Sequence, residues 1–155
     1  MNKFSIKYFI SKKFNCSYKG KVVDADEMDL RYNMFFGSIS LVRGISTIQL
    51  NWDWIPILDF ALGVLSIYTK LSMNERGEVE FDFTESDERL IFERLSETIK
   101  ITTTFSNEAL EMTFEEFEQG CIKFYKDALF NLINNNPELR YNKVFIEFLH
   151  KAEHI

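Results

Sequence analysis

The longest apolar stretch of the chain, residues 51–72, predicts a central helix. Apolar side chains recur at helical spacing on one face and cover the opposite side as well, so the helix must be buried in protein or lie in a membrane. Asp59 shortens the uninterrupted apolar run below the ~20 residues that a membrane span needs. We therefore expect a buried helix, with Asp53 as its N-cap and Pro56 in its first turn.

Alternating apolar and polar positions predict strands before this helix. Residues 4–10 read as a strand, Val22-Val23 as the continuation into a second strand, and residues 30–50 as further β structure. Within the last segment, Gly37 suggests a bulge or a close backbone approach, and Arg43-Gly44 suggests a hairpin turn.

Further strands are predicted after the central helix. Gly77 is expected to take a positive φ in the turn that follows the helix. Residues 78–83 alternate cleanly between acidic and apolar side chains, and residues 98–105 alternate with β-branched residues on both faces. Residues 90–95 fit either a strand or a helical turn.

Two helices are predicted near the C-terminus. Thr113 followed by Glu116 reads as a capping box, and the apolar stripe behind it indicates a long helix. Asn136 and Pro137 then begin a second helix. Its apolar face comprises Tyr141, Val144, Phe145, Phe148 and Leu149. We expect this last helix to cover Phe130, which lies off the stripe of the first.

The order of these elements predicts an α+β fold. Segregated strands with short connections favour an antiparallel sheet, with the central buried helix and the two C-terminal helices packed on it. The length of 155 residues fits a single domain over residues 1–155.

Composition narrows the classes of function. The net charge of −6 disfavours a nucleic-acid-binding surface or docking to anionic lipid, and suits a protein whose partner is basic. The N-terminal segment lacks the apolar core of a signal peptide, which favours the cytoplasm and reduced thiols.

Candidate chemical groups are few. Glu78, Glu80 and Asp82 share a strand face and read more readily as its solvated side than as paired catalytic carboxylates. His150 and His154 have the i, i+4 spacing of metal ligands but nothing in sequence to complete a site. The two cysteines offer no clearer chemistry, because Cys121 lies on an apolar helix stripe as a core residue would, and Cys16 has lysines but no histidine nearby in sequence. We therefore assign no catalytic residue, metal or cofactor.

Two other features allow a role in binding. The acidic run Asp24, Asp26, Glu27 and Asp29 is placed on a loop or strand edge, where it is either a solvated segment or a contact surface for a basic partner. Trp52 and Trp54 have the character of binding hot spots, although burial in so aromatic a core is the favoured reading.

The chain resembles the small acidic immunity proteins encoded beside bacterial polymorphic toxins. The resemblance rests on the overall design, on the block W-D-W-I-P-I-L-D-F-A and on T-F-E-E-F-E. It implies a non-enzymatic inhibitor of one toxin domain, and it carries over no functional residue. A subunit of a larger assembly and an enzyme of unknown chemistry are the alternatives, and a homo-oligomer is left open.

An acidic contact surface follows from this reading. Inhibition of a basic active site requires complementary negative charge. The first choice for this surface is the run of Asp24, Asp26, Glu27 and Asp29, and the second choice is the pair Glu115 and Glu118 on the capped helix.

Overall fold

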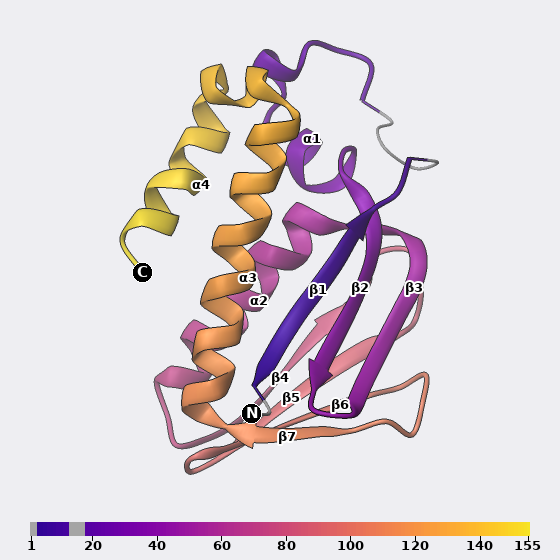
Figure 1. Ribbon diagram of the computed structural model, residues 1–155, viewed down its shortest axis with the longest axis vertical. Coiled ribbons are helices and arrows are strands. Elements are labelled where there is room, and N and C mark those ends of the chain that lie inside the picture. Colours follow the sequence, from indigo (N-terminus) through magenta and orange to yellow (C-terminus); the bar gives the residue numbers. More distant parts are fainter. Residues whose placement is uncertain (1–2, 13–17) are drawn as a thin grey trace.

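The computed structural model describes residues 3–12 and 18–155 and confirms the α+β class, with its strands divided between two antiparallel sheets (Figure 1). Cys16 lies outside the described residues. The elements in chain order are β1 (Phe4–Ile10), the 3-10 helix η1 (Val22–Asp24), α1 (Glu27–Tyr32), β2 (Phe36–Arg43), β3 (Ser46–Pro56), α2 (Ile57–Ser72), β4 (Arg76–Asp82), β5 (Arg89–Leu95), β6 (Thr98–Thr103), β7 (Leu110–Thr113), α3 (Phe114–Asn135), the 3-10 helix η2 (Pro137–Tyr141) and α4 (Lys143–Glu153).

The first sheet has the order β1-β2-β3, and two glycines shape it. The β2–β3 register shifts between Gly37 and Ile39. Gly37 also lets β2 approach β1 closely, because a Cβ added to Gly37 would collide with the backbone carbonyl oxygen of Phe9 on β1. Gly44, with a φ of 62°, turns the chain from β2 into β3. The predicted bulge and hairpin turn are therefore both confirmed.

The second sheet is a meander in the order β4-β5-β6-β7. It contains the predicted strands around residues 78–83 and 98–105, and residues 90–95 also form a strand. Gly77 is not the expected turn residue with a positive φ. It lies within β4, and Gly44 is the one glycine with a positive φ in the described part of the chain.

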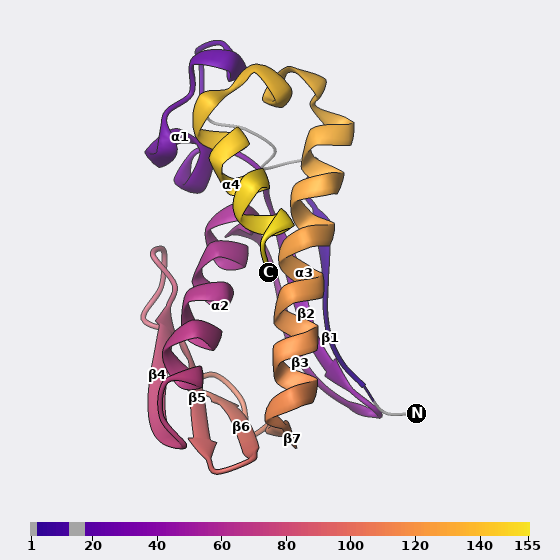
Figure 2. The ribbon, with the colours of Figure 1, turned by 90° about the vertical axis from the view of Figure 1, so that its left-hand side faces the viewer.

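Helix α2 is the predicted buried helix, with nearly all its apolar side chains in the core. Figure 2 shows β4 on one side of α2 and α3 on the other, with the first sheet behind α3. The expected N-terminus of this helix is wrong. Asp53 does not cap it, because residues 52–56 continue strand β3 and Pro56 is the N-cap residue. A proline disfavours helical backbone in the residue before it, so Ile55 stays extended.

Helix α3 begins at the predicted cap, since the Thr113 hydroxyl accepts a hydrogen bond from the Glu116 N–H at 3.1 Å. The Glu116 carboxylate, which was expected to complete a capping box, instead pairs with Arg43. The last helix differs from the prediction. Pro137 opens only η2, and α4 restarts behind Asn142. Tyr141 is consequently 70% exposed, and Phe130 remains 53% exposed instead of being covered.

Buried Asn142 explains this restart and ties α4 to the segment before α1. Its side-chain oxygen caps α4 by accepting from the Phe145 N–H at 3.0 Å. Its amide nitrogen donates to the carbonyls of Val22 and Ala25, both at 2.8 Å. Val22 and Val23 therefore form the 3-10 helix η1, and the expected second strand is absent at these residues.

Candidate functional site

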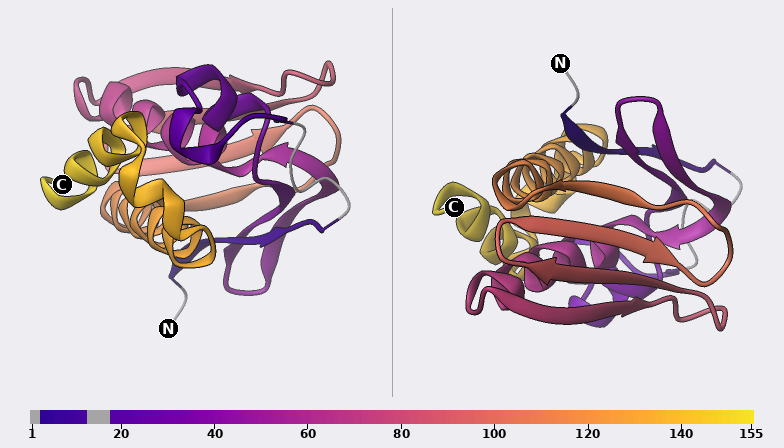
Figure 3. Two further views of the ribbon diagram at one scale, coloured as in Figure 1. Left: turned by 90° about the horizontal axis from the view of Figure 1, so that it is seen from above. Right: turned by 90° about the horizontal axis from the view of Figure 1, so that it is seen from below.

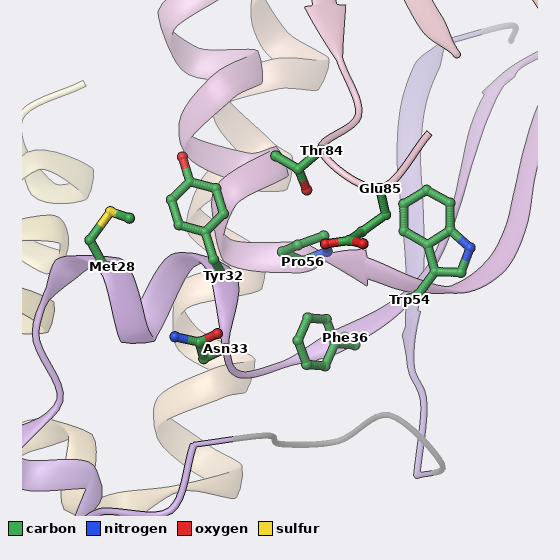
Figure 4. A pocket seen from close by; sticks show the side chains of 8 residues that line it. All are labelled: Met28, Tyr32, Asn33, Phe36, Trp54, Pro56, Thr84 and Glu85. Carbon is green, nitrogen blue, oxygen red and sulfur yellow. The ribbon is translucent and has the colours of Figure 1, made fainter. Parts of the chain in front are cut away.

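A cavity of about 710 Å³ opens beside α1, and we call it the aromatic pocket. Its walls come from α1, β2, β3 and the turn between β4 and β5 (Figure 4). The lining residues are Met28, Tyr32, Asn33, Phe36, Trp54, Pro56, Thr84 and Glu85. Half-buried aromatic rings and one carboxylate therefore face a single opening, in the size range of small-ligand pockets.

An irregular stretch of β3 positions Trp54. Asp53 has a φ of 63°, a conformation that aspartate tolerates better than most residues. Ser38 on β2 stabilises it: the Ser38 hydroxyl donates to Asp53 Oδ1 at 2.8 Å and accepts from the Asp53 N–H at 3.0 Å. The Trp52 and Trp54 rings then stack with centroids 5.1 Å apart, and Phe83 packs edge-on against both. Trp54 is thereby held as one wall of the pocket.

A second strained residue, Phe35, positions Phe36. Phe35 is buried and has a φ of 59°, an outlier for a bulky side chain. In this conformation its carbonyl accepts a hydrogen bond from the Ile57 N–H at 3.0 Å, at the start of α2. Unusual backbone of this kind often occurs at functional sites. Of the three non-glycine residues with a positive φ in the described chain, Phe35 and Asp53 directly precede a pocket residue, whereas Ser96 lies in the turn between β5 and β6.

Tyr32 forms the α1 wall and lies beside a largely buried ion pair. Arg31 contacts Asp59 of α2 through Nη2 at 2.6 Å and Nε at 2.8 Å. Burial raises the pKa of Tyr32, and the nearby Asp59 carboxylate raises it further. Tyr32 is therefore a neutral phenol at physiological pH, able to donate a hydrogen bond.

Glu85 supplies the charge within the pocket. Figure 4 shows its carboxylate pointing between Pro56 and Trp54. Within the described residues this carboxylate has neither a hydrogen-bond nor an ion-pair partner. The pocket thus joins apolar walls to an unpaired negative charge.

The structure separates the two groups of acidic residues predicted to bind a partner. Residues 24–29 are near the pocket, because Met28, Tyr32 and Asn33 line it. Glu115 and Glu118 lie in the first turns of α3, at the opposite end of the molecule (Figures 1 and 3). The six carboxylates therefore do not form one surface.

The acidic run is also not the loop or strand edge that the sequence suggested. Asp26 is the N-cap of α1 and forms a capping box with Asp29, while Glu27 pairs with Arg31 at 3.6 Å. Asp29 accepts a further hydrogen bond from Asn33 at 3.2 Å. Much of this acidity stabilises a short helix, and Asp24 and Glu27 remain exposed at its start.

The second-choice residues are partly engaged in the fold. Glu118 accepts a hydrogen bond from the Tyr68 hydroxyl, which raises the pKa of Tyr68 to about 12. Glu115 is exposed and accepts from Gln119 Nε2 at 3.4 Å. The neighbouring Glu116 is paired bidentately with Arg43, which lowers the pKa of Glu116.

The other candidate groups lie apart from the pocket. Cys121 is fully buried on α3, and this burial raises the pKa of its thiol well above the usual value. His150 and His154 are exposed near the end of α4. No group of three His, Cys, Asp or Glu side chains suited to a metal ion occurs within residues 3–12 and 18–155.

The acidic face of β4 is solvent-exposed. Glu78, Glu80 and Asp82 alternate along it, as the sequence indicated. Glu80 forms an ion pair with Arg89 of β5 at 3.0 Å.

Comparison of the chain with protein-family models, with curated proteins and with solved structures finds no match. Among the described helices, none combines the length and the apolar character that crossing a bilayer requires. The candidate site therefore stands on its own geometry.

Sequence reasoning missed most of the pocket, because its walls come from four separate elements. Trp54 was the one lining residue that the sequence suggested for binding. In the structure Trp52 and Trp54 are half-buried, which is intermediate between an exposed hot spot and a core residue. The spacing of Asp26 and Asp29, an acid three residues after a potential N-cap, is the signal that could have revealed α1.

Proposed function

We propose that this chain is a non-enzymatic binding protein that docks one protein partner with a basic surface. The observation that carries the proposal is the aromatic pocket, where half-buried aromatic side chains share a lining with the exposed Glu85. Helix α1 contributes Met28 and Tyr32 to this lining and also carries the exposed Glu27. Protein interfaces commonly combine such an apolar, aromatic centre with a polar rim. In this proposal the pocket is the centre of the interface, and the exposed acids Glu27 of α1 and Asp24 of η1 belong to its rim.

The partner class we propose is a toxin domain, as in immunity proteins. The design-level resemblance of the sequence supports this class, together with the net charge of −6. A nuclease or another toxin with a basic active site would be attracted to the α1 end by charge and anchored in the pocket. Protection by direct binding of this kind requires no catalysis.

Two alternatives receive less support. An enzyme would need a nucleophile paired with a base in a cleft. Glu85 could act as a base, but the described thiol is buried and neither histidine is among the lining residues of the pocket. A permanent subunit would expose one large apolar patch. The large exposed apolar residues instead come from separate elements, among them Phe9 on β1, Ile45 in the β2–β3 turn and Met73 after α2.

The test is capture of the partner with matched bait proteins. Met28 lines the pocket and is 63% exposed, and Ile45 is 104% exposed at a distant hairpin. Met28→Ser and Ile45→Ser both remove one exposed apolar side chain with little effect on stability. We expect a protein from the native host lysate to be retained by wild type and Ile45→Ser, and depleted about fivefold or more by Met28→Ser.

The captured protein then identifies the function. Expressed alone in bacteria it should arrest growth, and coexpression of this chain should restore growth. Equal retention by Met28→Ser and Ile45→Ser would remove the pocket from the interface. A partner that is harmless when expressed alone would exclude the immunity role.

A further inference from the structure

We infer that the aromatic pocket receives an arginine side chain of the protein partner, with its guanidinium against Trp54 and paired with Glu85. This inference rests on the proposed function and specifies what its central contact recognises. It follows from the charge, the shape and the rigidity of the pocket.

The charge of the pocket calls for a cation. Glu85 is solvent-exposed, and its carboxylate lies beside Pro56 and Trp54 without a partner among the described residues. The nearest basic side chain on α1, Arg31, is already engaged by Asp59 and Glu27. A purely apolar occupant would strip water from Glu85 and leave its charge unpaired, which is strongly unfavourable. An occupant with a positive charge replaces the lost water.

The shape of the pocket favours arginine over lysine. Trp54 lies beside the carboxylate, and Phe36 and Tyr32 supply further aromatic walls of the same pocket. A guanidinium is planar, weakly hydrated and able to stack on an aromatic face while donating two parallel hydrogen bonds to a carboxylate. An ammonium group is strongly hydrated and binds as a point charge. Tryptophan is also the aromatic residue that attracts cations most strongly.

The Trp54 wall is preorganised for this contact. Trp52 stacks on Trp54 with planes 12° from parallel, and Phe83 packs edge-on at 6.5 Å between centroids. The hydrogen bonds between Ser38 and Asp53 hold the backbone that presents the ring. A side chain that is already ordered loses little freedom when a ligand arrives, which favours affinity.

Several features point to a protein residue and not to a free cation. Helix α1 lines the pocket through Met28 and Tyr32, and the exposed acids Glu27 on α1 and Asp24 on η1 come just before these residues in the chain. A free cation could pair with Glu85 but would leave the apolar walls and these acids without a contact. An arginine on a basic protein surface contacts the pocket and the rim together.

The first experiment measures recognition by the pocket directly. The probes are acetylated, amidated tripeptides with arginine, lysine, citrulline or norleucine between two glycines. Binding is followed by NMR through the indole N–H resonance of Trp54. We expect the arginine peptide to bind at about millimolar concentration and at least about tenfold more tightly than citrulline, its neutral isostere. Equal binding of these two peptides would overturn the inference.

Two matched variants test whether the Glu85 carboxylate is the charge that recognises arginine. Glu85→Gln removes the carboxylate inside the pocket, and Asp87→Asn removes an equal charge in the same turn outside the lining. Glu85→Gln should abolish the preference for arginine over citrulline, and Asp87→Asn should preserve it. Equal losses in both variants would show only a long-range charge effect and would also overturn the inference.

The captured partner separates this inference from the proposed function. Replacement of a single partner arginine by lysine should weaken binding to wild type, but not to Glu85→Gln. If Met28→Ser loses the partner while Glu85→Gln and Asp87→Asn bind it equally, the binding function stands and the arginine contact falls. Self-association of wild type that Glu85→Gln abolishes would assign the pocket to a second copy and overturn the partner assignment.

Discussion

Arg31 and Asp59 form an ion pair between α1 and α2, across 28 residues of sequence, with Arg31 Nη2 2.6 Å from Asp59 Oδ1. Asp59 is the residue that interrupts the apolar run of the central helix, and it is only 8% exposed. The pair fixes the short helix α1 against α2 and so sets the position of Tyr32 in the pocket wall. A buried charge in the core helix is thereby connected to the candidate site.

Replacement of Asp59 by Asn should lower the free energy of unfolding by about 3 kcal/mol, because Arg31 loses its partner in a largely buried site. This value is at the low end for such pairs, since the Arg31 side chain keeps 27% exposure. Arg31→Met should cost a similar amount. The double variant should recover part of the loss, which urea unfolding of all four proteins will measure. Additive losses would show that the pair contributes no coupling.

Local patterns predicted most of the secondary structure, because the relevant forces act over a few residues. The alternation in residues 78–83 and the cap at Thr113 both lead to the expected elements. The start of α2 was misplaced because Asp53 suits both a helix N-cap and a left-handed backbone position. Pro56 was the better guide, since it keeps Ile55 extended.

Local sequence patterns could not predict the pocket. Tyr32, Trp54 and Glu85 come together only through tertiary packing of α1, β3 and the β4–β5 turn. The partners that position them are equally distant in sequence, as in the hydrogen bonds between Ser38 and Asp53. The exposed acids Asp24 and Glu27 could be proposed from clustering alone, but their separation from Glu115 depends on the fold.

Two substitutions at Asp53 should separate backbone strain from hydrogen bonding. Asp53→Ala removes the contact with Ser38 and keeps a side chain at a φ of 63°, whereas Asp53→Gly removes the contact and relieves the strain. We expect the glycine variant to be more stable than the alanine variant by about 1 kcal/mol. The measurement is the urea midpoint. Equal midpoints would mean that the left-handed conformation is lost in both variants.

Gly37→Ala should destabilise the first sheet by on the order of 3 kcal/mol, because its Cβ would collide with the backbone carbonyl of Phe9. Gly77→Ala is the matched control. A Cβ there has only the side chain of Leu71 nearby, at 3.7 Å, and alanine in a strand should leave stability unchanged or slightly raised. Thermal melting of the two variants gives the comparison, and similar midpoints would contradict the close approach of β1 and β2.

Alkaline pH should weaken the fold through Tyr125. Its buried hydroxyl donates to the Phe148 carbonyl at 3.0 Å, and burial raises its pKa from 10.0 to about 12. Between these values the unfolded chain releases the proton while the folded chain keeps it. The stabilisation is therefore complete below pH 10 and is lost as pH rises toward 12, with a slope of at most about 1.4 kcal/mol per pH unit from this residue.

Tyr125→Phe removes this proton from both states. Urea unfolding at intervals between pH 8 and pH 11 should show a shallower loss of stability in the variant than in wild type. Its stability at pH 8 should be lower by about 1 kcal/mol, because the hydrogen bond from α3 to α4 is gone. If the free energy of unfolding falls equally steeply with pH in the two proteins, the Tyr125 phenol has the same pKa in the folded and unfolded chain.

The charges at the start of α1 should govern how fast the captured partner associates. Asp26 is unsuitable for this test because it caps α1, so reversal is confined to Asp24→Lys with Glu27→Lys. Glu111→Lys with Glu115→Lys makes the same charge change on exposed residues at the opposite end of the molecule. Exposed charges at the rim of an interface act mainly on the association rate, and salt screens their effect. The same charges contribute little to the stability of the fold. The variant with Asp24→Lys and Glu27→Lys should therefore associate about tenfold more slowly at low salt, with a flatter salt dependence. Its melting temperature should fall only slightly, through loss of the partly exposed pair between Glu27 and Arg31. The control should differ little from wild type in stopped-flow measurements, and equal rates for all three proteins would place the interface elsewhere.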